Sequence, residues 1–125
     1  MLATTNPDEA YRRSAFDARV QGGDTAALVV LCLEQAAAGM SGALLANERQ
    51  DPAARSKALT RALTAITALE MGVDRTASLA RSLLLVYGGA RRALLESVVD
   101  FDPALLSAVR QDLLDIETAL RSAER

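Results

Sequence analysis

The chain has 125 residues, enough for one domain with a single core, and its net charge of −2 provides no basic surface of the kind that binds nucleic acid. It contains no histidine, which removes the commonest metal ligand and general base and excludes a histidine phosphotransfer bundle. Its one cysteine, Cys32, rules out an internal disulfide, and neither a glycine-rich phosphate loop nor an inward pair of carboxylates is evident. We therefore expect a protein that is not an enzyme and that needs no cofactor or metal.

The N-terminal stretch "MLATTNPDEAYRR" lacks the basic and then apolar layout of a secretory signal peptide. A single cysteine also suits a reducing compartment. Both observations favour a cytoplasmic location.

Helix starts are marked along the chain by proline and by capping side chains. An Asn or Asp oxygen can accept a hydrogen bond from the first free N–H groups of a helix, and proline suits the position that follows. In two further stretches, "GGDTAAL" and "MGVDRTASL", glycine ends one helix and Asp24 or Asp74 begins the next. The three proline starts are Asn6-Pro7, Asp51-Pro52 and Asp102-Pro103.

No run alternates with the period of a strand, and no hairpin turn signal appears, so the sequence predicts an all-α fold. The last helix shows the pattern most clearly, with apolar residues spaced by three and four. Short connections between long helices favour an antiparallel up-down four-helix bundle over residues 22–125. A short extra N-terminal helix within residues 1–21 would be an appendage. The five expected helices span 7–21, 25–48, 52–71, 75–99 and 103–123.

The stretch "LVVLCLEQAAAGMSGALLA", residues 28–46, is long enough to cross a membrane. Glu34 and Gln35 near its middle, and the absence of aromatic residues at its ends, argue against insertion. A central bundle helix explains most of the pattern. Residues 28–33, however, are apolar in nearly every direction around the helix, more than one bundle seam uses. The apolar side chains that the bundle seam does not use must be covered by something else: the first helix, another subunit or a partner segment.

The chain resembles a known family, and the residues that carry the resemblance are spread over more than a hundred positions. The resemblance begins at Ala10-Tyr11 and continues through "KALTRALTAITAL", Val73-Asp74, "LARSLLLVY" and Asp102-Pro103. In these features the chain is similar to FliS, the flagellar secretion chaperone family. It departs from the family pattern at Thr25, where proline is usual, at Leu33, where an aromatic residue is usual, and at Gly88-Gly89.

The resemblance implies a cytoplasmic chaperone that binds the C-terminal segment of flagellin, prevents premature polymerisation and keeps flagellin competent for type III secretion. Residues 1–21 are expected to form a displaceable lid, because Tyr11, Ala15, Phe16 and Val20 make one apolar stripe and the "GGD" that follows is a natural hinge; the alternative is an integral fifth element of the fold. The resemblance also makes flagellar export gate or regulatory proteins candidates for further partners. We expect the free chain to be a monomer or weak dimer that does not insert into membranes. The alternative is a structural helical homo-oligomer, or an adaptor, that uses its surplus apolar face for self-association. The partner-binding residues expected are Tyr11, Val20, Leu28, Leu31, Gln35, Met40, Ile66, Leu69, Leu83 and Tyr87.

Overall fold

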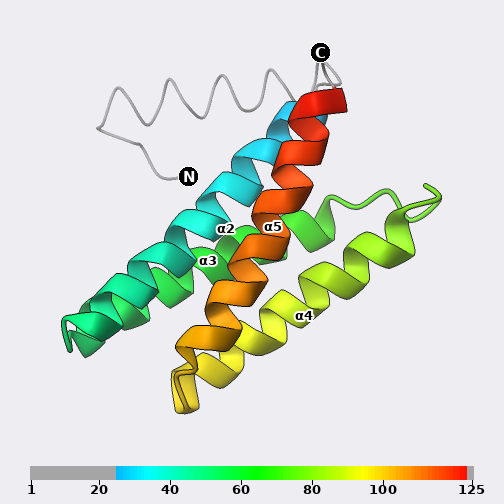
Figure 1. Ribbon diagram of the computed structural model, residues 1–125. Coiled ribbons are helices and arrows are strands. Elements are labelled where there is room, and N and C mark those ends of the chain that lie inside the picture. The colour runs from blue at the N-terminus through cyan, green and yellow to red at the C-terminus, as the bar shows by residue number, and fades with distance from the viewer. Residues whose placement is uncertain (1–24, 124–125) are drawn as a thin grey trace, which may run out of the picture.

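The computed structural model describes residues 25–123, and within them it contains four long helices and no strand (Figure 1). The predicted helix 7–21, with Tyr11 and Val20, lies outside the described residues. The helices are α2 (Thr25–Glu48), α3 (Pro52–Met71), α4 (Ala80–Val99) and α5 (Pro103–Ala123). The predicted bounds of α2, α3 and α5 are confirmed.

Two of these helices begin as their Asp-Pro pairs predict. The Asp51 carboxylate accepts a hydrogen bond from the backbone N–H of Ala54 at 3.1 Å, and Pro52 occupies the first turn of α3. Asp102 accepts from the N–H of Leu105 at 3.1 Å in the same way at the start of α5. Each carboxylate thus satisfies one N–H group that the helix itself cannot pair.

The predicted start of α4 at residue 75 is wrong, because the helix begins five residues later at Ala80. The carboxylate of Asp74 accepts two hydrogen bonds from Thr76, one from its backbone N–H at 3.0 Å and one from its hydroxyl at 2.6 Å. These bonds lower the pKa of Asp74 and close a local turn that competes with helix capping. Leu79 instead precedes α4, without a side-chain cap.

The four helices form a closed ring in which each helix packs against its neighbours in sequence and α5 returns to α2. The antiparallel up-down four-helix bundle is therefore confirmed. Helices α2 and α3 approach closely at Gly39, where an added Cβ would lie 2.8 Å from the backbone nitrogen of Ala62. The buried cluster at the centre is Leu33, Ala36, Met40, Ala43, Leu59, Ala62, Ala65, Ile66, Leu69, Tyr87, Ala90, Leu94, Leu106 and Leu113.

The long apolar stretch is thereby largely explained as core. By length and composition α2 could cross a membrane, but the core helix of a bundle passes the same test. Leu33, Ala36 and Met40 on this helix have no exposed surface at all, and α2 packs against both α3 and α5. Its outward side, with Leu31 and Gln35, is only partly covered.

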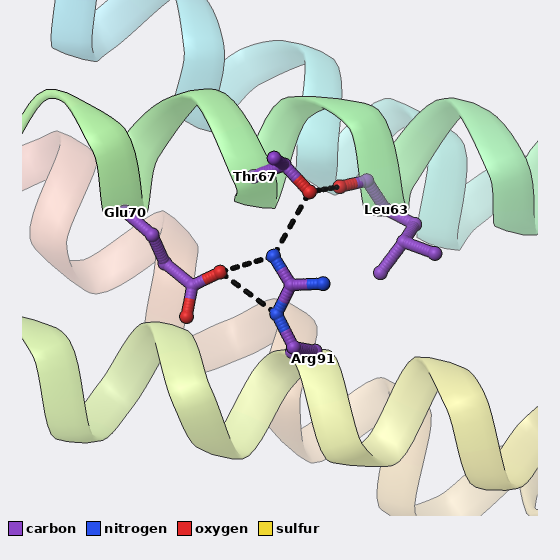
Figure 2. A network of polar contacts seen from close by, with 4 residues as sticks. All are labelled: Leu63, Thr67, Glu70 and Arg91. Carbon is purple, nitrogen blue, oxygen red and sulfur yellow. Dashed lines mark hydrogen bonds and ion pairs between the residues drawn. The ribbon is translucent and has the colours of Figure 1, made fainter.

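Helix α4 is held to α3 near its middle by a polar clamp (Figure 2). Arg91 donates from Nε to Glu70 Oε1 at 2.8 Å and from Nη2 to the Thr67 hydroxyl at 2.9 Å, and it forms an ion pair with Glu70. Thr67 in turn donates to the backbone carbonyl of Leu63 at 2.9 Å. From its connection with α5, α4 diverges from α5 toward its own N-terminus (Figure 1), and a pocket lies at that end of the bundle, which we call the open end.

Candidate partner-binding site

The divergence of α4 leaves a pocket of about 430 Å³ at the open end of the bundle. Each of the four described helices contributes to its wall, and so does the irregular connection between α3 and α4. The lining residues are Ala26, Val29, Leu69, Gly72, Val73, Asp74, Ala77, Leu79, Ala80, Leu83, Tyr87, Ile116, Ala119 and Leu120.

The described lining of this pocket is almost wholly apolar, since Asp74 and Tyr87 are the only residues with polar side chains among those of 25–123 that line it. The Tyr87 side chain is buried, and this burial raises its pKa, with a smaller contribution from the nearby Cys32. Within residues 25–123, no hydrogen bond is made by the Tyr87 hydroxyl. A buried tyrosine usually finds such a partner. The hydroxyl can therefore serve a group that enters the pocket.

A second hollow of about 360 Å³ lies between α2 and α3. Leu31 and Gln35 line it from α2, and Arg61 donates two hydrogen bonds to the Gln35 side-chain oxygen, from Nη2 at 2.7 Å and from Nε at 3.2 Å. Cys32 also lines this hollow. Burial raises the pKa of its thiol, so Cys32 is an apolar wall residue and a poor nucleophile.

The structure thus divides the predicted partner-binding residues into separate groups. Leu69, Leu83 and Tyr87 meet at the open end, whereas Leu31 and Gln35 lie in the α2–α3 hollow. The remaining described residues of the prediction line neither hollow. Leu28 is half-buried, and Met40 and Ile66 are core residues with 0% exposure, out of reach of a partner unless the bundle opens.

Sequence reasoning missed several residues that line the pocket. Ile116 and Leu120 fit the apolar seam of the last helix without pointing to a site. Val29 belongs to the apolar run 28–33 and Leu79 to the stretch "LARSLLLVY", but neither pattern distinguishes them from their apolar neighbours. Each is an apolar residue near the end of a helix, and these ends meet at one end of the bundle. An antiparallel bundle brings the start of α2 and the end of α5 together, which is the signal that could have identified them.

The arrangement suits the capture of apolar side chains. Among residues 25–123, no group of three His, Cys, Asp or Glu side chains is placed to hold a metal ion. Comparison with protein families gives a match to flagellar protein FliS over residues 7–125. Among curated proteins, none matches the chain. With a four-helix bundle as its fold and a family match over nearly its whole length, the chain belongs to the FliS family of flagellar chaperones.

Proposed function

We propose that this chaperone acts in the cytoplasm, where it binds the apolar C-terminal segment of a flagellin and prevents its polymerisation before export. The observation that supports the proposal is the apolar pocket opened by the divergence of α4. Binding without catalysis is the whole of the proposed activity. Contacts with export gate or regulatory proteins stay predictions from the family resemblance.

The size of the pocket indicates how much of the segment it can hold. It lies within the range of ligand pockets, roughly 300–1,000 Å³, and has room for two or three aliphatic side chains. Burying that many contributes about 3–9 kcal/mol. A micromolar complex needs about 8 kcal/mol net, and ordering a disordered segment costs about 2–5 kcal/mol more. The pocket alone falls short of this sum.

A second contact is therefore needed, and the hollow between α2 and α3 offers one. We propose that the flagellin segment lies across both places, with apolar side chains in the pocket and further ones against Leu31. The Tyr87 hydroxyl then donates a hydrogen bond to a backbone carbonyl of the segment. Such a bond fixes the position of the segment more than it adds affinity.

The first test is titration of the chain with full-length flagellin and with flagellin that lacks its C-terminal segment. We expect one-to-one binding to the full-length protein and little binding to the truncated one. Equal affinity for both would refute the proposed substrate segment.

The second test places a charge at the pocket without disturbing the core. Ala119 is an exposed residue of α5 that lines the pocket, so Ala119→Glu should leave the fold intact. A carboxylate that becomes buried under the bound segment without a partner should weaken flagellin binding at least tenfold, about 1.4 kcal/mol. The matched control is Ala108→Glu, an exposed alanine of the same helix that lies outside the pocket. If both variants bind flagellin equally well, the open end is not the site.

A further inference from the structure

The side of α4 that faces away from the bundle carries an unusual row of residues, which we call the outer seam. Its members recur at intervals of four, three, four, three and four, the spacing of a coiled-coil seam. Leu85, Leu95 and Val99 within it are 68%, 48% and 89% exposed, and α4 contacts only α3 and α5 among the described helices. The outer seam consists of Arg81, Leu85, Gly88, Arg92, Leu95 and Val99.

The glycine in this seam has no explanation within the described chain. A Cβ added at Gly88 would meet no described atom within 4 Å, so tight packing does not require glycine there. Glycine inside a helix costs about 1 kcal/mol relative to alanine. Close approach by a surface from outside these residues would offset this cost.

The seam is symmetric about its midpoint, at position 90. Residues 81 and 99, 85 and 95, and 88 and 92 lie at equal distances on either side of it. We propose that two copies of the chain form a dimer through this seam, with the two α4 helices antiparallel. Leu85 then packs on the partner copy's Leu95, and the aliphatic part of Arg92 lies over the space that Gly88 leaves.

The charges at the two ends of α4 also fit a second copy. Near its N-terminus, Arg75 and Arg81 flank the partly exposed pair Leu84 and Leu85. Near its C-terminus, a hollow of about 490 Å³ is lined by Leu95, Val99 and Leu105 together with the carboxylates of Glu96, Asp100 and Asp102. Within residues 25–123, no ion pair joins these arginines or these carboxylates to other groups. An antiparallel partner brings the arginines of one copy to the carboxylates of the other.

This charge pattern opposes the dipole of α4 itself. A helix is stabilised by acidic residues in its first turn and basic residues in its last turn, and α4 has neither. Instead, the basic Arg81 lies in the first turn of α4 and the acidic Asp100 lies at its C-terminal end. In an antiparallel pair the positive end of one helix faces the negative end of the next, so both the dipoles and the side-chain charges become complementary. In a two-fold symmetric contact of this kind, each interaction between the two copies occurs twice.

The dimer does not depend on the proposed flagellin site. Leu83 and Tyr87 face the pocket, while Leu85 and Gly88 lie on the outer side of the same helix. Loss of the dimer and loss of flagellin binding are therefore separable results.

The two Arg92 side chains lie near the symmetry axis, and Glu96 one turn along the same helix screens their repulsion.

The test is sedimentation equilibrium of the full chain over a range of concentration, with two charge-reversal variants. Wild type should approach twice its 13.2 kDa as concentration rises to about 500 μM. Arg81→Glu and Asp100→Arg should each raise the dissociation constant at least tenfold, because each places two like-charge pairs in the homodimer. Both substitutions favour the α4 dipole, so misfolding would not account for the loss.

Mixing the two variants gives the decisive result. In the mixed dimer the glutamate introduced at position 81 of one copy faces the arginine introduced at position 100 of the other. The native Arg81 likewise faces the native Asp100, so an equimolar mixture should dimerise within about threefold of wild type. The controls Lys57→Glu and Asp112→Arg, at exposed positions on α3 and α5, should leave the dissociation constant unchanged. A wild-type chain that stays monomeric, variants that dimerise normally, or a mixture that does not recover would each overturn the proposal.

Discussion

Replacing glycine by alanine at two positions should change stability in opposite directions. At Gly39 the new methyl group would lie 2.8 Å from the Ala62 nitrogen, 2.9 Å from the Ala58 carbonyl oxygen and 2.9 Å from the Ala62 Cβ. Ordinary contacts begin near 3.4 Å, and backbone atoms cannot rotate away. Helix α3 must therefore shift by about half an ångström along a face packed at crystal density.

The magnitude follows from two opposing terms. Overpacking of this kind costs typically 1–3 kcal/mol, and the loss of contacts along the displaced α2–α3 face adds to it. Against this, alanine is about 1 kcal/mol more favourable than glycine inside a helix. We expect Gly39→Ala to lower the free energy of unfolding by about 1–3 kcal/mol. The methyl group of Gly88→Ala meets no atom of residues 25–123 within 4 Å, so this change should raise the free energy of unfolding by up to about 1 kcal/mol.

Urea denaturation at pH 7 measures both effects, at a chain concentration low enough to keep the protein monomeric. The slope of unfolding free energy against urea should stay unchanged, because the surface exposed on unfolding is the same. If Gly39→Ala were as stable as wild type, the α2–α3 contact would be looser than the structure indicates. If Gly88→Ala were destabilising, that glycine would be required inside the monomer.

Two further predictions concern α4. The raised pKa of Tyr87 means that the folded state favours the protonated hydroxyl, so its contribution to stability is complete below pH 10 and falls as pH rises further. Above pH 10 wild type should therefore lose stability more steeply than Tyr87→Phe in urea denaturation, and parallel curves would contradict the shift. Arg91→Met removes the clamp and leaves Glu70 half-buried without its cation, which should cost about 1–2 kcal/mol. Hydrogen exchange should then speed up in residues 80–90, and unchanged exchange there would mean that the clamp does not hold α4.

Helix positions could be predicted from the sequence where a capping side chain has no competing partner. Asp51 and Asp102 are each followed by proline, which fixes the backbone for a helix start, and both cap as expected. Asp74 is followed two residues later by Thr76, whose backbone N–H and hydroxyl both donate hydrogen bonds to the Asp74 carboxylate. Because the carboxylate takes part in this local turn, it does not cap a helix. The delayed start of α4 at Ala80 follows from this competition.

The candidate site was harder to predict, because apolar spacing gives the direction of a side chain and not the distance to the next helix. Met40 and Leu31 both fit an apolar face of α2, yet Met40 is sealed in the core while Leu31 lines an open hollow. Met40 lies beside Gly39, where the backbones of α2 and α3 approach closely, whereas Leu31 lies nearer the start of α2, away from that contact. The divergence of α4 from α5 is likewise a tertiary property with no signal in the local pattern.

The position of the pocket decides where a probe can be attached for binding measurements. Ala26 and Leu120 both line it, so a fluorophore or fusion domain joined after the end of α5 begins beside the site and competes with the ligand. The turn between α2 and α3 lies at the opposite end of the bundle (Figure 1). Arg49 in that turn is exposed and suits a thiol label as Arg49→Cys. Cys32 is the chain's only cysteine, so Cys32→Ala, which keeps the wall of the α2–α3 hollow apolar, must accompany the change to keep the label at one place.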